Sequence, residues 1–387
     1  GWDGMSSVTA MRTSVLAART VLSCSQAVSL AGTEVTLLQQ NTTSPPTKSL
    51  LGYCSELVAK GGQGLVPGHR LRYATASGRG QQSTNEVLMV APTAFEYNSS
   101  AAVDNHFMTA VGEDEKSLVR EAVVREHEGL RNMLKDQLGL KVHLFDHSEA
   151  HGTPDAVFPN NWFSTHGGGE VDKSTLVTYP MKSESRRRER REDILSYLRG
   201  LGGYEKELVM EESEGKGIFL EGTGALVLDR ANKVAYAVIS ERCDRDLAEA
   251  WVKEVGYDRL VAFHSYDGEG QPVYHTNVVM AIGTSVAVVC TDSVTDAGER
   301  AFLLDNLRAH RAVVEISHDQ MSRFCGNVLE VMNAKGLPCF VMSTQAYDAF
   351  TDDQKAVLRA NLEGGVHHVP LDTIEKIGGG GVRCTIA

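Results

Sequence analysis

Residues 86–93 read EVLMVAPT, a short apolar run that ends in a polar turn, and a run of this kind occurs five times in the chain. The others are STLVTYPM (174–181), VAYAVISER (234–242), SVAVVCTD (285–292) and PCFVMSTQ (338–345). Apolar runs of this length between turn residues are typical of buried β-strands. Amphipathic patterns in between predict helices over residues 115–139, 185–199, 244–255, 295–309 and 345–361. In the first helix, Leu118, Val123 and Leu130 are expected on the apolar face.

Strands that alternate with helices predict the α/β class. Five recurrences over about 300 residues favour a pseudo-fivefold repeat closed around an axis. A doubly wound sheet would give a similar alternation. However, no strand leads directly into GxGxxG and then a helix, and the glycine-rich GKGIFLEGTGALVL (215–228) matches that motif poorly.

The first 85 residues differ in composition from the rest of the chain. They contain three acidic residues and seven Lys and Arg, although the whole chain has 50 acidic and 38 basic residues. We therefore expect an extension over 1–85 and a catalytic domain over 86–387. Residues 5–33 contain Arg, Ser, Thr and Ala but no acid, which is typical of a transit peptide to mitochondria or another organelle. A disordered extension of a cytoplasmic protein is the alternative.

Charge and cysteine content exclude several classes of protein. A net charge of −12 argues against a nucleic-acid partner. No apolar run approaches the roughly 18 residues of a membrane span, so we expect no membrane partner. The seven cysteines are scattered, odd in number and without a CxxC pair, which indicates neither a disulfide framework nor a zinc ribbon.

Three residues in separate motifs could form a thiol-based catalytic group. Cys384 follows four glycines in KIGGGGVRC, and ordering such a run is costly unless the backbone approaches something closely. His275 begins the apolar run in VYHTNVVMAIG, and Glu221 interrupts one in IFLEGTGALVLD. Together they would supply a nucleophile, a general acid/base and a carboxylate that orients the imidazole. A flexible tail with an incidental cysteine and a structural histidine are the simpler alternatives.

The stretch HLFDHSEAH carries a competing signal for a metal site. His143, His147 and His151 recur every four residues, which would align three imidazoles on a helix. However, KVHLFDH alternates as a strand does, which would scatter the three side chains. We therefore expect a solvated turn here and no metal.

Arginines could bind an anion at two places. The run SRRRERRE (185–192) is typical of the charged face of a helix, and a guanidinium could also clamp a carboxylate through two parallel hydrogen bonds. Arg242, in ISERCDRD, offers a second such group.

Eight motifs in order resemble the guanidino-group modifying superfamily, which includes arginine deiminase, dimethylarginine hydrolase and amidinotransferases. They are most similar to its citrulline hydrolase branch. They are distributed over the region 86–387 and read APTAFEYNSSAAVDNHFM, DAVFPNNWFSTH, YPMKSESRRRERR, LEGTGALVLDR, SERCD, YHTNVVMAIG, FCGNVLEV and IEKIGGGGVRC. The resemblance implies the pentein fold, a five-bladed α/β propeller of ββαβ repeats around a central channel.

The resemblance also implies roles for individual residues. Cys384 matches the nucleophile, His275 the general acid/base and Glu221 the acid beside it. Asp155 matches a carboxylate that binds the nitrogen end of the substrate. Arg186, or a neighbour within 186–188, and Arg242 match arginines that bind the α-carboxylate. No cofactor is implied.

Asn160 and Asn161 fall where dimethylarginine hydrolases carry two acids that face a cationic guanidinium. A ureido group is neutral, and amides can pair with both its N–H groups and its carbonyl. The sequence therefore predicts hydrolysis of citrulline to ornithine, ammonia and carbon dioxide through a covalent thiol adduct. The alternatives are an arginine or methylarginine deiminase and a non-catalytic binding protein of the same fold. The partner we expect is a small amino acid, with a homo-oligomer left open.

Overall fold

The computed structural model describes residues 81–167 and 169–387. The transit peptide and most of the extension predicted over 1–85 lie outside the described residues. None of the helices in the described part is long and apolar enough to cross a membrane.

Five separate sheets form within the described residues, and each contains one of the five predicted apolar runs. The strands in these runs are β1 (Glu86–Val90), β4 (Thr175–Thr178), β7 (Val234–Val238), β10 (Val286–Val289) and β13 (Pro338–Ser343). Each pairs in parallel with a later strand, namely β2 (Lys141–Phe145), β5 (Lys206–Val209), β8 (Arg259–Phe263), β11 (Ala312–Glu315) and β14 (Val366–Val369). Four also pair antiparallel with the strand just before them: β3 (Phe163–His166), β6 (Leu226–Asp229), β9 (Met280–Ile282) and β12 (Leu329–Met332).

Helices connect the parallel strands, as such crossovers require. They are α3 (Lys116–Asn132), α4 (Glu184–Arg187), α5 (Glu192–Gly202), α7 (Arg245–Val255), α9 (Ala297–Arg308), α11 (Thr344–Ala349) and α12 (Asp352–Asn361). The ββαβ unit is therefore present four times, and the first unit is βαβ. Shorter helical segments are η2 (Glu113–Glu115), η3 (Met133–Gln137), η4 (Glu149–His151), η5 (Pro159–Asn161), η6 (Glu211–Lys216), α6 (Gly222–Ala225), α8 (Thr276–Val279), α10 (His318–Ser322), η7 (Ile374–Gly378) and α13 (Val382–Thr385).

All five predicted helical regions are helical, but two of them are divided. The region 345–361 breaks between α11 and α12, because Thr351 adopts extended backbone and caps α12 in a capping box with Gln354. The region 185–199 breaks where Arg191 is extended before α5. Leu118 is also not where the helical pattern places it, since it is 67% exposed whereas Val123 and Leu130 are fully buried.

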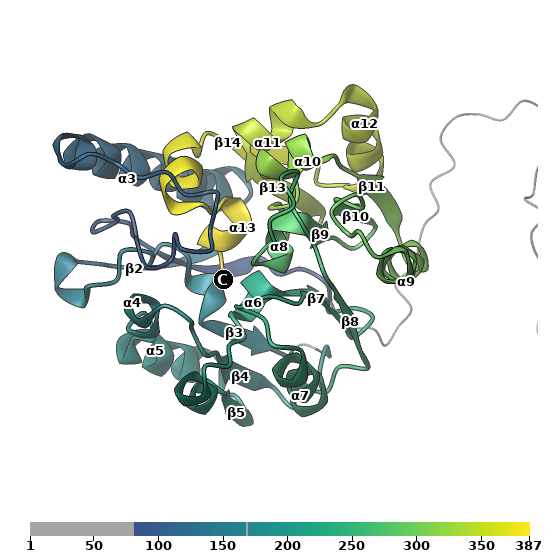
Figure 1. Ribbon diagram of the computed structural model, residues 1–387, viewed down its shortest axis with the longest axis horizontal. Helices are drawn as coiled ribbons and strands as arrows, with labels where there is room; N and C mark the ends of the chain where they lie inside the picture. Colours follow the sequence, from purple (N-terminus) through teal and green to yellow (C-terminus); the bar gives the residue numbers. More distant parts are fainter. Residues whose placement is uncertain (1–80, 168) are drawn as a thin grey trace, which may run out of the picture. The chain divides into compact units, whose positions relative to one another are not determined.

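The last residue of the chain completes the first sheet. The backbone N–H of Leu88 in β1 donates to the carbonyl of Ala387 at 2.7 Å, and the N–H of Ala387 donates back at 3.0 Å. In Figure 1 the C-terminus and α13 lie in the middle, with elements of the five sheets around them. The fold is thus a mixed α/β fold with five sheets, and its closure into a propeller stays a prediction.

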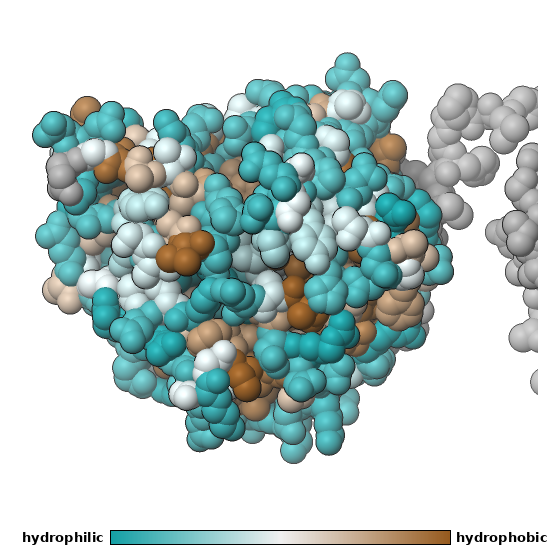
Figure 2. Space-filling view, in the orientation of Figure 1, coloured by the Kyte–Doolittle hydropathy of each residue, from teal (hydrophilic) through white to brown (hydrophobic). Residues whose placement is uncertain are grey.

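The core consists mainly of strand residues and the helix faces that cover them. Trp251 of α7 is fully buried, and its indole N–H donates to the hydroxyl of Tyr179 at 2.8 Å. Burial of each large apolar side chain contributes about 1.5–3 kcal/mol to folding. Figure 2 shows a largely hydrophilic face on which apolar residues occur in small groups.

Candidate active site

The predicted catalytic residues lie on short helical turns that are close together in the fold. Glu221 is the N-cap of α6, and His275 is the N-cap of α8, each just before the first strand of its repeat. Asn160 and Asn161 end η5 at the same point of another repeat, and Cys384 lies in α13. Segment α6 contacts both η5 and α8, while α13 also contacts η5. The repeat therefore brings polar residues together that are far apart in sequence.

Six of the eight predicted site residues line a single small pocket: Asp155, Asn161, Arg186, Arg242, His275 and Cys384. Glu221 does not line it, but its carboxylate contacts both His275 and Arg242. Asn160 does not line it either. Its side-chain amide is buried, and within the described residues neither its oxygen nor its nitrogen has a hydrogen-bond partner.

Two asparagine amides contact the sulfur of Cys384. Nδ2 of Asn327 lies 3.3 Å and Nδ2 of Asn277 lies 3.4 Å from Sγ. Burial raises the pKa of the Cys384 thiol, and the hydrogen bond from Asn327, the charge of Arg383 and the hydrogen bond from Asn277 act against that rise. In the absence of substrate the group is therefore a neutral thiol at pH 7, placed where donors would stabilise its thiolate.

The glycine run before Cys384 is packed closely, as its sequence predicts. A Cβ at Gly378 would come within 2.7 Å of the Phe158 ring, and one at Gly379 within 2.6 Å of the Asn105 amide. Gly379 also has a φ of +65°, which disfavours any side chain. Cys384 is only 7% exposed. These contacts rule out the alternative of a flexible tail.

His275 and Glu221 form a buried pair. Nε2 of His275 lies 2.9 Å from Oε2 of Glu221. Burial lowers the pKa of His275 despite that hydrogen bond. Burial alone would raise the pKa of Glu221, but Arg242 and His275 outweigh it and hold this pKa well below its usual range. The pair is therefore a carboxylate and a neutral imidazole, with the proton assigned to Nε2 and the lone pair to Nδ1.

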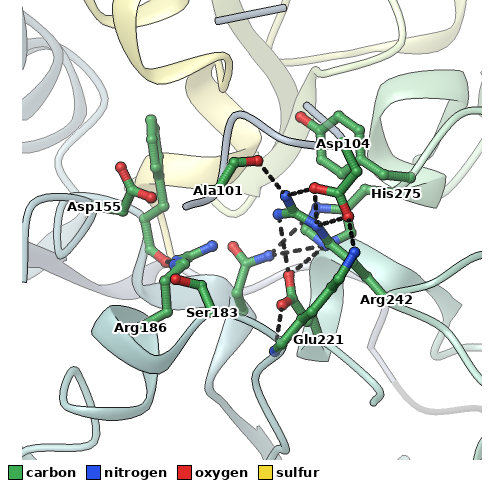
Figure 3. Close-up of polar contacts among 12 residues, drawn as sticks. Ala101, Asp104, Asp155, Ser183, Arg186, Glu221, Arg242 and His275 are labelled. Atoms are coloured by element: carbon green, nitrogen blue, oxygen red, sulfur yellow. Dashed lines mark hydrogen bonds and ion pairs between the residues drawn. The ribbon is translucent and has the colours of Figure 1, made fainter. Parts of the chain in front are cut away.

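Arg242 lies between two acids. Its Nε is 3.1 Å from Oδ1 of Asp104, its Nη2 also bonds Asp104, and its Nη1 is 3.5 Å from Glu221 (Figure 3). Nη2 donates to the carbonyl of Ala101 at 2.7 Å, and the guanidinium lies 4.7 Å from the centroid of the Tyr274 ring. The segment that carries Ala101 and Asp104 therefore holds Arg242 in place, and Ala101 of this segment also lines the pocket.

Arg186 is the pocket-lining arginine of the run 186–188. Its Nε and Nη2 each lie 3.0 Å from the Glu189 carboxylate, and Nη2 also donates to the carbonyl of Phe158 at 2.9 Å. Arg187 and Arg188 instead donate to backbone carbonyls, among them that of Gly152. The structure thus places Arg186, and not its neighbours, at the pocket.

Asp155 has one carboxylate oxygen available to a ligand. Oδ2 accepts a hydrogen bond from Asn98 at 2.8 Å, while the buried Oδ1 has no partner within the described residues. Burial raises the pKa of Asp155, although Arg186 and the Asn98 hydrogen bond oppose the rise. A buried carboxylate oxygen gains most from an N–H donor, so this one could bind the nitrogen end of a substrate.

Asn277 and Asn327 are functional candidates to which the sequence analysis assigned no role. The repeat contains a usable signal, because each precedes the first strand of its unit, as Asn161 and Glu221 do. A search for polar residues just before the first strand of each repeat would have found both asparagines.

The alternative metal site does not form. His143 lies in β2 and bonds the hydroxyl of Tyr197, His147 bonds Thr153, and His151 bonds Ser148. Over residues 81–167 and 169–387, no group of three or more His, Cys, Asp or Glu side chains could hold a metal ion. Only His143 lies in the strand of residues 141–145, whereas the rings of His147 and His151 stack on each other with centroids 5.3 Å apart.

Solved structures of enzymes share this fold. The N-terminal domain of the cyanobacterial arginine dihydrolase ArgZ, bound to its substrate, matches 78% of this chain and 97% of that domain, with 18% identity and a TM-score of 0.58. The dimethylarginine hydrolase of Pseudomonas aeruginosa, complexed with citrulline, matches 79% of this chain and 98% of its own, with 15% identity and a TM-score of 0.53. The chain spans 40% of the longer ArgZ chain. Identities this low show the fold alone.

Curated protein sequences give no match. The family model described as eukaryotic N,N-dimethylarginine dimethylhydrolase matches residues 91–387, which include all eight predicted site residues. With the fold and this match, the chain lies in the guanidino-group modifying superfamily, and it belongs to the N,N-dimethylarginine dimethylhydrolase family.

Proposed function

We propose that this member of the family cleaves the ureido group of citrulline and yields ornithine, ammonia and carbon dioxide. Family membership makes it a hydrolase of the type that acts on guanidino groups. The observation that carries the finer proposal is the side-chain amide of Asn161. It lines the pocket, and its Nδ2 lies 3.4 Å from the His275 ring. A neutral amide at this place suits a neutral substrate head group.

The charges around the pocket support the same substrate. A guanidinium stays cationic at every physiological pH, so a buried pocket needs spare negative charge to bind it. Glu221 and Asp104 are already paired with Arg242, and Glu189 is paired with Arg186. Among these four acids around the pocket, and within the described residues, Asp155 alone keeps a buried oxygen without a hydrogen-bond partner. A ureido N–H could bind that oxygen while the ureido carbonyl accepts from an amide.

We also propose that Arg242 and Arg186 bind the α-carboxylate of the substrate. Both line the pocket and are buried. Their Nε and Nη2 atoms are bonded to protein acceptors, so each arginine would donate to the carboxylate from Nη1, which in Arg242 has only the 3.5 Å contact with Glu221. Citrulline would then add no net charge to the pocket, because its ureido group is neutral and the charges of its α-carboxylate and α-ammonium group cancel.

The reaction would start with proton transfer from the Cys384 thiol to Nδ1 of His275. The thiolate attacks the ureido carbon, and the oxyanion takes hydrogen bonds from neighbouring N–H donors. His275, stabilised as imidazolium by Glu221, then protonates the leaving δ-nitrogen, and ornithine departs. His275 next takes a proton from water, which attacks the S-carbamoyl group. The released carbamate decomposes to ammonia and carbon dioxide.

A methylarginine or arginine substrate is the second candidate, and the unpaired oxygen of Asp155 favours it, because that oxygen could face a cation. Incubation with citrulline, arginine and dimethylarginine separately, with ornithine, citrulline and amine products quantified, distinguishes the candidates. Cys384→Ala serves as the control. Equal turnover by that variant would refute the thiol mechanism, whereas no turnover of any of the three compounds by the unmodified chain would favour the binding role.

The domain limits belong to the same proposal. We place the catalytic domain at residues 86–387, with its five sheets closed as a five-bladed propeller around the pocket. Residues 1–85 would form an extension that directs the protein to mitochondria or another organelle. N-terminal sequencing of the protein from its native cell tests the extension.

A further inference from the structure

A second cavity of about 390 Å³ lies beside the candidate active site. It shares no lining residue with the pocket that contains Cys384. Residues of the first strands of four repeats line it, together with residues 81–87 and Arg383. Its volume is in the range of small-molecule sites, about 300–1,000 Å³.

Arg383 and Cys384 are neighbours in α13, yet they line different cavities. Arg383 is enclosed by the protein, but part of its surface stays accessible from the cavity. Its Nη1 donates to the carbonyl of Ile386 at 3.1 Å, and in the described part of the chain it pairs with no carboxylate. Burial lowers the pKa of Arg383 to about 10, and the charge of Arg230 acts in the same direction. A half-buried guanidinium that pairs with no carboxylate of the described residues is free to bind an anion in the cavity.

The three acids that line the cavity do not supply that anion, and the first of them, Glu86, already accepts a hydrogen bond from Lys141 at 2.9 Å. Oε2 of Glu170 lies 2.6 Å from Nη1 of Arg230, and Oε1 bonds His166 at 2.9 Å. Glu330 accepts hydrogen bonds from Ser83 and Thr284, and burial raises its pKa. The charge of Glu170 is therefore balanced by Arg230, and the Glu330 carboxyl is occupied by two hydroxyl donors while burial makes its ionisation less favourable.

The remaining walls indicate what kind of anion fits. Leu228, Ile282, Val331 and Ile386 contribute apolar surface to the cavity. A planar guanidinium matches a carboxylate through two hydrogen bonds, and the apolar walls match an aliphatic chain. We propose that this cavity binds a small aliphatic carboxylic acid, with its carboxylate on Arg383.

Such a ligand would act on the active site through charge. The positive charge of Arg383 favours the thiolate of Cys384, and a bound carboxylate would neutralise that charge. The ligand is therefore an inhibitor that does not enter the Cys384 pocket. This consequence depends on the reactivity of the thiol and not on which substrate the enzyme cleaves.

Calorimetric titration of the full chain with hexanoate tests the site. Hexanoate should bind Arg383→Met about ten- to hundredfold more weakly, because this variant loses a hydrogen bond to a charged group. Binding should disappear in Leu329→Trp, which fills the cavity from a half-buried lining position. Arg242→Gln, in the other pocket, should bind hexanoate as the unmodified chain does. Hexylamine, with the opposite charge, should not bind.

Alkylation of Cys384 by iodoacetamide, followed by peptide mass spectrometry, tests the coupling without any substrate. Saturating hexanoate should slow the alkylation of the unmodified chain about threefold, which corresponds to a rise of about half a unit in the pKa of Cys384. It should not slow the alkylation of Leu329→Trp. Hexanoate binding that is unchanged in both Arg383→Met and Leu329→Trp, or lost in Arg242→Gln, would overturn the proposal. Failure of hexanoate to bind the unmodified chain would do the same. Any of these results leaves the proposed citrulline hydrolysis untouched.

Discussion

The side-chain amide of Asn327 holds the sulfur of Cys384: its Nδ2 lies 3.3 Å from Sγ, and its Oδ1 lies 3.7 Å from the same atom. The same Oδ1 accepts the backbone N–H groups of Gly381 and Arg383, each at 3.2 Å. These two hydrogen bonds set the orientation of the amide, so that Nδ2 points at the thiol. Asn327 thus positions the C-terminal segment and also stabilises the thiolate of Cys384.

Asn327→Leu should slow alkylation of Cys384 at neutral pH about ten- to hundredfold, because a hydrogen bond to a charged group contributes about 1.5–3 kcal/mol. The pH profile of the alkylation rate should shift upward by about one to two units. Asn132→Leu, at an exposed position, is the matched control and should change neither quantity. An unshifted profile in Asn327→Leu would show that the amide only supports the fold.

Glu221→Gln should lower kcat about 10²- to 10⁴-fold with a smaller effect on KM, because His275 loses the carboxylate that stabilises its imidazolium. Steady-state kinetics across pH measures this effect. Glu212→Gln, on an exposed segment, serves as the comparison and should keep full activity. A normal kcat in Glu221→Gln would remove Glu221 from the catalytic group.

Arg242→Gln should raise KM for citrulline by about 10- to 100-fold, because the variant loses a charge-assisted hydrogen bond to the α-carboxylate. Carbamoylputrescine, which lacks the α-carboxylate, should be cleaved poorly by the unmodified enzyme and no worse by the variant. Initial rates with both compounds test the assignment. An equal loss with both would mean that Arg242 acts through Asp104 or Glu221 and not on the carboxylate.

Glu375 should make the fold less stable as the pH rises. Burial raises its pKa to about 8 from 4.5, and its Oε1 has no hydrogen-bond partner within residues 81–167 and 169–387. The folded state therefore binds more protons than the unfolded state between these two values, so stability falls as pH rises through that window, by up to about 1.4 kcal/mol per pH unit. Urea unfolding at pH 5 and pH 8 should show this loss in the unmodified chain.

Glu375→Gln, which resembles the neutral acid, should remove most of that difference. Glu128→Gln, at an exposed position of α3, should leave it in place. If Glu375→Gln lost as much stability between pH 5 and pH 8 as the unmodified chain, the raised pKa would not be the cause.

The apolar runs predicted the five main strands, because each run stands between turn residues and so shows a clear local pattern. The antiparallel strands β3, β6, β9 and β12 were not predicted, although β4 and β10 are equally short. Three of them, such as Met280–Ile282, begin within two residues of a short helical segment that interrupts the strand pattern. The contact of Asn327 with Cys384 joins residues 57 positions apart and depends on the assembled repeats. The exposure of Leu118 likewise depends on what the neighbouring elements cover.

In the candidate site, too, the sequence predicted some features and missed others. The motifs predicted roles for Cys384, His275 and Glu221, since chemistry limits which residue types can fill such roles. They also predicted a role for both neighbouring amides, but only Asn161 lines the pocket. A 3₁₀ turn directs two successive side chains differently, and the sequence alone did not specify which of them faces the ligand.

Asn161→Asp should therefore change substrate preference. A carboxylate 3.4 Å from the His275 ring would favour a cationic head group and disfavour a neutral one. We expect kcat/KM for citrulline to fall about 10- to 100-fold relative to that for arginine or dimethylarginine, a difference of about 1.4–2.8 kcal/mol. An unchanged ratio would mean that Asn161 does not sort substrates.

The products formed from citrulline distinguish citrulline hydrolysis from its alternatives. The purified chain is incubated with citrulline, and ornithine and ammonia are quantified, with Cys384→Ala as the blank. Our account predicts equal amounts of ornithine and ammonia, formed only by the chain that retains Cys384. Formation of citrulline from arginine or dimethylarginine, with no ornithine from citrulline, would contradict it.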